Sequence, residues 1–198
     1  GFNCSQPDAC NDTNAVCNGT CVCQPGYYDD TGGNDTDGTC KEKVGLGSKC
    51  SQPDACNDSN AECNGTCVCQ PGYYDNTGVN DTDGVCTAKV GLGSNCSQPD
   101  ACNDTNAVCI GTCVCQPEYY DGNGVNNTDG ICTAKVDLGS KCPQPEACLT
   151  PHAECGISST NQSGICVCRK EYYGTNRTEP RGECRNVTEL KVTAINYT

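Results

Sequence analysis

The chain of 198 residues contains no Met and no Trp, one Phe (Phe2) and one His (His152). Leu, Ile, Val and Phe together number 25, about 13% of the chain. That fraction lies below the roughly 20% under which a strongly charged chain tends to stay disordered. A chain of this length would otherwise need one or two domains with ordinary hydrophobic cores. The composition therefore excludes most enzymes and calls for another source of stability.

Cysteine is the abundant residue. The 24 Cys make up about 12% of the chain, above the ~8–10% that marks a disulfide scaffold. Because cytosolic thiols are kept reduced, we expect the protein to mature in the secretory pathway and to be secreted, with an extracellular role. The sequence starts at Gly1 without Met, which is typical of a processed product or a fragment. No apolar run approaches the ~18 residues of a membrane span.

The charge is acidic and unevenly distributed. The net charge is −13; residues 1–49 carry 7 acidic and 3 basic side chains, whereas residues 142–198 carry 6 of each. Nucleic acid is an improbable partner for so acidic a chain, because its phosphates would be repelled.

Self-similarity is the strongest feature of the sequence. Cys4, Cys50, Cys96 and Cys142 follow one another at a constant step of 46 residues. Three near-identical repeats share the frame Cys-x5-Cys-x6-Cys-x3-Cys-x-Cys-x16-Cys, and a divergent fourth widens the third gap. We divide the chain into repeat 1 (1–49), repeat 2 (50–95), repeat 3 (96–141), repeat 4 (142–185) and a tail (186–198).

Spacing alone leaves fifteen possible pairings of six Cys open. The single residue between the fourth and fifth Cys, followed by Gln24-Pro25-Gly26-Tyr27, resembles the epidermal growth factor-like (EGF-like) module. The resemblance implies that the first Cys pairs with the third, the second with the fourth and the fifth with the sixth. The implied pairs are Cys4 with Cys17, Cys10 with Cys21, Cys23 with Cys40, Cys50 with Cys63, Cys56 with Cys67, Cys69 with Cys86, Cys96 with Cys109, Cys102 with Cys113, Cys115 with Cys132, Cys142 with Cys155, Cys148 with Cys166, and Cys168 with Cys184.

Whichever pairing holds, each bridge should stabilise its repeat by roughly 3 kcal/mol in the chain-entropy model, which burial of so few aliphatic side chains could not supply. The alternative, a thiolate metal cluster like metallothionein, calls for denser Cys.

The secondary structure should be sparse. Segment 22–28 has β-formers around a Pro-Gly turn, and the polar stretch 29–38 follows, so we predict a small hairpin with a long loop in each repeat. Between repeats lie Val-x-Leu linkers. We predict that each Tyr pair, such as Tyr27-Tyr28, packs on the following Val44 and Leu46; the alternative is a flexible linker.

Asn-x-Ser/Thr acceptors for N-glycans are frequent: fourteen of the twenty Asn qualify. Glycans at these sites would cover the flanks of each repeat and leave its ends free. Asn3 and Asn95 have Cys as the middle residue, so we expect them to be used least. The alternative is that most acceptors are silent. The predicted glycosylation sites are Asn11, Asn18, Asn34, Asn57, Asn64, Asn80, Asn103, Asn126, Asn161, Asn176, Asn186 and Asn196.

Catalytic and metal-binding patterns are weak. His152 is the sole His, so a Ser-His-Asp or Cys-His set could use only that residue, and every Cys has a plausible disulfide partner. We expect His152 at the surface. Aligned with a calcium-binding EF-hand loop, Asn34-Asp35-Thr36-Asp37-Gly38 lacks ligands at positions one and twelve. We therefore predict no enzyme activity, no cofactor and no calcium site.

The tail has a different pattern. Leu190, Val192 and Ala194 alternate with polar residues, as in a half-exposed strand, which must pair with repeat 4, with residues beyond the chain or with another molecule.

These features predict a small disulfide-rich fold, an elongated array of four tandem EGF-like modules with short β-hairpins. EGF-like arrays occur in adhesion proteins and in proteins of algal flagellar hairs. The leading hypothesis is a structural extracellular glycoprotein, a stalk, spacer or filament subunit whose partners are copies of itself, head to tail. The alternative is an adhesion or receptor-binding ectodomain with a cell-surface or matrix partner; a Cys-rich inhibitor is a third class.

Overall fold

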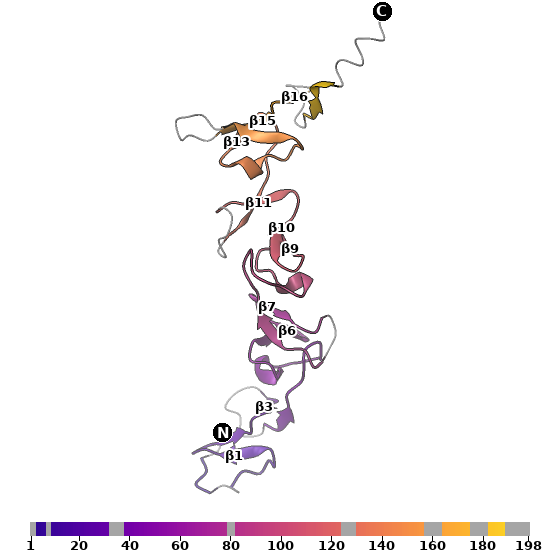
Figure 1. Cartoon of the computed structure of the whole chain (residues 1–198). Coiled ribbons are helices and arrows are strands. Elements are labelled where there is room, and N and C mark those ends of the chain that lie inside the picture. Colours follow the sequence, from indigo (N-terminus) through magenta and orange to yellow (C-terminus); the bar gives the residue numbers. More distant parts are fainter. Residues whose placement is uncertain are drawn as a thin grey trace, which may run out of the picture. The chain divides into compact units, whose positions relative to one another are not determined.

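The computed structural model (Figure 1) describes residues 3–6, 9–31, 38–78, 82–123, 130–156, 164–174 and 182–188. Its contacts form two compact units, which are described separately. One comprises Gly1–Val90 with Cys96–Asn103, and the other comprises Gly91–Asn95 with Asp104–Thr198.

Repeats 1 to 3 are each built from two antiparallel two-stranded hairpins, and each strand is short. In the first hairpin, the first strand ends at the third Cys of the repeat, and the second strand runs from the fourth Cys to the fifth. Its strands are β1 (Ala15–Cys17) with β2 (Cys21–Cys23), β5 (Ala61–Cys63) with β6 (Cys67–Cys69), and β9 (Ala107–Cys109) with β10 (Cys113–Cys115).

The second hairpin brings the Tyr pair beside the sixth Cys. Its strands are β3 (Tyr27–Asp29) with β4 (Cys40–Glu42), β7 (Tyr73–Asp75) with β8 (Cys86–Ala88), β11 (Tyr119–Asp121) with β12 (Cys132–Ala134), and β16 (Tyr172–Gly174) with β17 (Cys184–Asn186). The predicted hairpin is therefore present in all four repeats, and the first hairpin is an element that the sequence analysis did not predict.

Repeat 4 enlarges the first hairpin into a three-stranded sheet. The wider gap between Cys155 and Cys166 lengthens its strands, β14 (Ala153–Gly156) and β15 (Gly164–Cys168), and β13 (Lys141–Cys142) pairs with the other edge of β15.

Short 3-10 helices precede the second Cys of repeats 2 to 4. They are η1 (Pro53–Ala55), η2 (Pro99–Ala101) and η3 (Pro145–Ala147). Each has Pro at its start. The N–H of the first helical residue has no partner within the helix, so its absence in Pro costs no hydrogen bond.

The Pro-Gly turn between the hairpins changes type along the chain. Tyr27 N–H donates to the Gln24 carbonyl, and Gly26 has a φ of 88°, as at the third position of a type II turn. Glu118 and Glu171 replace this Gly in repeats 3 and 4. Neither adopts a positive φ, although Tyr119 and Tyr172 keep the equivalent hydrogen bonds to Gln116 and Arg169. The turn thus accepts Glu by changing its backbone conformation.

All 24 Cys are in disulfide bonds. Ten bridges follow the order implied by the resemblance, with Cα–Cα distances of 5.4 to 5.8 Å. Cys96, Cys102, Cys109 and Cys113 are also bridged, and their pairing stays a prediction.

Sulfur forms much of the interior. The largest fully buried side chains among the described residues are Cys67, Cys113, Cys142 and Cys166. One core cluster gathers Leu46, Cys56, Ala61, Cys67 and Cys86, and another gathers Tyr120, Cys142, Ala147, Cys155 and Cys166. The bridges therefore both constrain the chain and replace the aliphatic core that it lacks.

The tail is described only at its start. Asn186, the first residue of the tail, is the last residue of β17. Val187 and Thr188 have a helical backbone rather than an extended one. The predicted alternation at Leu190, Val192 and Ala194 lies outside the described residues.

Candidate functional site at the repeat junctions

The linker between repeats 1 and 2 is hydrogen-bonded along its length. Lys43 N–H donates to the Gly26 carbonyl of repeat 1 at 2.8 Å, and the next residue already bonds repeat 2. Val44 N–H donates to the Ala55 carbonyl at 2.8 Å, and the Val44 carbonyl accepts from Asn57 N–H at 2.9 Å. No unbonded residue separates the two attachments, so the flexible-linker alternative is wrong for this junction.

Leu46 is the main apolar anchor of this linker. It is 5% exposed and packs in the cluster that contains Cys56, Cys67 and Tyr73, all from repeat 2. The adjacent Gly47 N–H donates to the Cys67 carbonyl, and Cys67 N–H donates to the Ser48 carbonyl. Leu46 therefore completes the core of the repeat that follows it.

Two Tyr residues, each from a different pair, pack on different repeats. Tyr73, the first of its pair, packs on the core cluster of its own repeat. Tyr120, the second of its pair, is 8% exposed and packs on Cys142 and Ala147 of the next repeat, with Val136 of the linker alongside. The prediction that a Tyr pair packs on the following linker is confirmed for Tyr120 and Val136. The prediction did not include the contact between Tyr120 and the disulfide-bonded Cys of the next repeat.

The same bonds recur at the later junctions. Val90 N–H donates to the Ala101 carbonyl, and Gly93 N–H donates to the Cys113 carbonyl. Between repeats 3 and 4, Val136 N–H donates to the Ala147 carbonyl, and the Val136 carbonyl accepts from Leu149 N–H. In each case a parallel bridge joins the linker Val to the second Cys of the next repeat.

A Gln side chain adds a further contact across each junction. Gln52 Nε2 donates to the Asp30 carbonyl at 3.3 Å, Gln98 Nε2 donates to the Asn76 carbonyl at 3.4 Å, and Gln144 Nε2 donates to the Asp121 carbonyl. The sequence analysis missed this residue. Its persistence as Gln144 in the divergent fourth repeat is the signal that could have revealed it.

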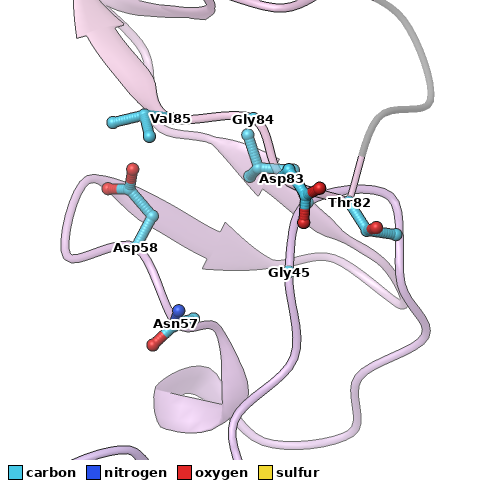
Figure 2. A pocket seen from close by; sticks show the side chains of 8 residues that line it. Gly45, Asn57, Asp58, Thr82, Asp83, Gly84 and Val85 are labelled. Atoms are coloured by element: carbon cyan, nitrogen blue, oxygen red, sulfur yellow. The ribbon is translucent and has the colours of Figure 1, made fainter.

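A pocket of about 400 Å³ lies beside the linker between repeats 1 and 2. It is lined by Gly45 and Leu46, by Asn57 and Asp58, and by segment 82–85. Figure 2 shows Asp58 facing Val85 across it and Gly45 beside Thr82. A Cβ at Gly45 would stand 2.0 Å from the Thr82 carbonyl oxygen, so only Gly fits here without a shift.

Asp58 is a structural clamp and not a free ligand. Its Oδ1 accepts Asn60 N–H at 2.7 Å and its Oδ2 accepts Cys86 N–H at 2.8 Å. Asp12 and Asp104 make the same pairs of bonds in repeats 1 and 3. In repeat 4, Thr150 takes this position and donates its hydroxyl to the Gly182 carbonyl at 3.3 Å.

The predicted glycan acceptors are accessible wherever the structure describes them, except one. Asn186 is half-buried, and its Oδ1 accepts both the N–H and the hydroxyl of Thr188. The exposed acceptors are Asn11, Asn18, Asn57, Asn64 and Asn103. Asn34, Asn80, Asn126, Asn161, Asn176 and Asn196 lie outside the described residues.

The clustered Cys and the single His make contacts with other side chains. Four Cys triplets, one per repeat, bring their sulfurs within 4.8 Å of one another, and every one of these sulfurs is in a disulfide. His152 is exposed, as expected, and stacks on Tyr172 with ring centroids 4.2 Å apart. The calcium-like segment and its copies, residues 80–84 and 126–130, lie outside the described residues apart from Gly38, Thr82, Asp83, Gly84 and Gly130.

These features define a class of protein. Disulfide-stapled repeats with short hairpins, joined through linkers that complete the next repeat, make this chain a tandem cysteine-rich repeat protein of the EGF-like type.

Comparison with protein families identifies the kind of module. Residues 34–80 and 76–126 match the EB module, which is an EGF-like cysteine-rich module. Each matched segment runs from the long loop of one repeat to that of the next, so Cys40 and Cys69 have their disulfide partners outside the first segment. Neither the curated proteins nor the solved structures gave a match. Among the residues that the structure describes, no helix could cross a membrane.

Proposed function

We propose that this protein is a secreted structural glycoprotein, a stalk, spacer or filament subunit without enzymatic activity or cofactor. Disulfide-rich repeat modules of this type suit extracellular structural or binding proteins. The observation that carries the structural role is the junction between repeats 1 and 2. Lys43 N–H is hydrogen-bonded to repeat 1 and Val44 N–H to repeat 2, so no free residue separates the two attachments.

The chemistry of the surface supports the same role. Buried polar or charged side chains are absent from the described residues, and the described acceptors in repeats 1 to 3 stand on exposed loops. N-glycans there would keep a thin array soluble and block contacts along its flanks while leaving the ends free for copies of the chain. A head-to-tail arrangement of copies is therefore the form of self-association that we favour.

The alternative is an adhesion or receptor-binding ectodomain. One observation favours it: repeat 3 has Ile110 where repeats 1 and 2 have acceptor Asn, and Ile110 is 71% exposed at the tip of its hairpin. A protein partner could use this apolar, sugar-free position. The near-identity of repeats 1 to 3 argues for a spacer, because a specific epitope would single out one repeat.

Glycosylation is tested by mass spectrometry of the protein expressed in a eukaryotic secretory pathway, before and after enzymatic removal of N-glycans. We expect several occupied sites and the loss of one glycan in N64Q. I110N creates Asn-Gly-Thr in repeat 3 and should add one glycan at the matched position. A secreted chain without sugar would contradict the glycoprotein proposal.

The structural role is tested by negative-stain electron microscopy of native material. Regular fibres support the filament subunit, and separate particles spaced along a surface support the stalk. Individual molecules that bind a cell-surface protein in a manner abolished by I110N would favour the adhesion alternative instead.

A further inference from the structure

Two disulfides of repeat 2 lie against each other. The first bridge, Cys50–Cys63, joins the first Cys of the repeat to the third, and the second bridge, Cys56–Cys67, joins the second to the fourth. The sulfurs of Cys50, Cys56 and Cys67 all lie within 4.8 Å of one another, and the same three positions cluster in the other repeats. The Cys50 sulfur is therefore close to a disulfide that is not its own.

The register of the first hairpin explains this closeness. Cys63 ends β5, Cys67 begins β6, and the two residues stand directly opposite each other in the antiparallel pair. Opposed residues project from the same face of a hairpin, so the two bridges leave it side by side. Such residues have Cα atoms about 4.5–5.5 Å apart, a separation that a disulfide can span. Cys63 and Cys67 are thus placed for a bond that the folded repeat does not make.

Access to the first bridge differs between repeats 2 and 4. Cys50 and Cys63 are both half-buried. Their counterparts in repeat 4, Cys142 and Cys155, are 0% and 7% exposed. These two Cys belong to the three-stranded sheet, in which β13 pairs with the edge of β15, whereas repeat 2 has only an isolated β-bridge at that edge. A thiol in solution can therefore reach the first bridge of repeat 2 far more easily than that of repeat 4.

We propose that the first bridge of repeat 2 is a reactive site for small thiols, which convert the repeat to a second bridge pattern, Cys50–Cys56 with Cys63–Cys67. This inference goes beyond the proposed structural role and does not depend on it.

A sequence of thiol–disulfide exchanges gives this product without net oxidation or reduction. The small thiolate attacks the Cys63 sulfur, forms a mixed disulfide there and releases Cys50 as a thiolate. Cys50 attacks the adjacent Cys56 sulfur, which breaks the second bridge and releases the Cys67 thiolate. Cys67 then attacks the opposed Cys63 sulfur, closes the Cys63–Cys67 bond and expels the small thiolate. The thiol is recovered, so it acts as a catalyst.

The second pattern loosens the junction between repeats 1 and 2. Both native bridges tie segment 50–56 to the hairpin of β5 and β6, whereas each new bridge lies within one of these two parts. The linker also meets this hairpin through hydrogen bonds, from Gly47 N–H to the Cys67 carbonyl and from Cys67 N–H to the Ser48 carbonyl. In the second pattern these hydrogen bonds lose their covalent support. A small thiol thus converts a firmly attached linker into a looser one.

The test is treatment of the folded, oxidised chain with about 1 mM reduced glutathione near neutral pH, followed by acid quenching and disulfide mapping. Every sample is first freed of N-glycans by enzyme. Cleavage at Lys and at acidic residues places Cys50 and Cys56 on separate short peptides and leaves Cys63 and Cys67 together on a third. The native pattern links both short peptides to the third, and the second pattern links the short peptides to each other.

We expect a fraction of repeat 2 in which Cys50 is linked to Cys56, together with a mixed disulfide of glutathione on Cys63. Glutathione should react about tenfold faster with repeat 2 than with repeat 4, because access limits the exchange. The amides of Gly47 and Cys67 should exchange faster with deuterium in the treated chain. A native pattern throughout, or equal reaction of repeats 2 and 4, would overturn the proposal.

The variant C63S isolates the attack by Cys50. It leaves Cys50 as a thiol beside the second bridge, so the exchange needs no added thiol. Alkylation should then find free thiol on Cys56 or Cys67 as well as on Cys50. A free thiol that stays on Cys50 alone would contradict the exchange.

The variant C86S is the matched control. It leaves Cys69 as a thiol in the same repeat, half-buried as Cys50 is, but outside the cluster of three sulfurs. Its free thiol should remain on Cys69. Scrambling in C86S to the same extent as in C63S would show that closeness of sulfurs does not direct the exchange, and the assignment of Cys50 would fail.

Discussion

At the scale of single residues, polar side chains fix the loops that the disulfides leave open. Asp58 accepts the N–H of Asn60, two residues further on, and the N–H of Cys86, 28 residues further on. The clamp recurs at Asp12 and Asp104. These hydrogen bonds matter because little apolar burial stabilises the repeat. The half-buried side chain of Asp58 supplies acceptors for two backbone N–H groups.

D58A should destabilise repeat 2 by about 1–3 kcal/mol, because it removes the acceptor of two backbone donors. Amide exchange of Cys86 and its neighbours should accelerate, whereas repeat 1 should keep its rates. D54A removes an exposed carboxylate from the same repeat and is the matched control. Equal exchange in the two variants would contradict the clamp.

The Asp30–Lys41 ion pair makes a pH-dependent contribution to the stability of the folded state. The hydrogen bond from the Lys41 ammonium, and then that from Thr39 N–H, hold the pKa of Asp30 below its ordinary value of 3.8. Asp30 raises the pKa of Lys41 in turn.

Because the Asp30 pKa is lower in the folded state, its contribution to stability is present above pH 3.8 and is lost as the pH falls through the folded pKa. We expect an Asp30 carboxyl titration midpoint below 3.8 by NMR, and a higher midpoint in K41Q. Exposure and salt screening keep this effect small. An unchanged midpoint in K41Q would assign the shift to Thr39 alone.

At the scale of elements, the linker belongs structurally to the repeat that follows it. Leu46 lines the pocket beside Gly84 and fills the core of repeat 2. Leu92 lies at the same place before repeat 3, where a Cβ on Gly130 would be 2.9 Å from its Cδ1. In the first linker, Leu46 thus packs on the disulfide core and also lies at the end of the long loop of the same repeat.

L46A should destabilise repeat 2 by about 2–5 kcal/mol, because it leaves a cavity against the Cys56–Cys67 bridge. Amides of residues 56–86 should exchange faster, and those of 9–31 should not. L149A, at a side chain 39% exposed, is the control and should have little effect. Faster exchange in repeat 1 instead would mean that Leu46 serves the preceding repeat.

At the scale of the whole chain, covalent closure replaces hydrophobic collapse. Closed loops of this size are each worth roughly 3 kcal/mol in the chain-entropy model. The buried side chains among the described residues are largely Cys, Ala and Leu, and most of the large aliphatic side chains are exposed.

Complete reduction under native conditions should therefore unfold every repeat. Far-ultraviolet circular dichroism and loss of amide dispersion would measure this unfolding, with alkylation counting 24 released thiols. Re-oxidation after dilution is the control for chemical damage. Retention of dispersed amide resonances after full alkylation would show that burial alone holds the fold.

Sequence reasoning predicted the four repeats and the second hairpin, because periodicity and β-forming residues are visible without coordinates. The disulfide order came from the resemblance to the EGF-like module, since spacing alone left the pairing open. Sequence reasoning missed the first hairpin, since Ala15–Cys17 and Cys21–Cys23 are too short to show a strand period. It also placed Leu46 with the preceding Tyr pair, because nearness in sequence does not reveal which neighbouring core has room for a side chain.

What the sequence determined by itself is that covalent bridges must hold the chain together: six Cys recur in every repeat, and few aliphatic residues exist to form any other core. Only the tertiary structure decided how adjacent repeats are joined. The partners of Val44, Gln52 and Leu46 depend on which backbone groups and sulfurs the bridges leave accessible, and those positions exist only once the loops have closed.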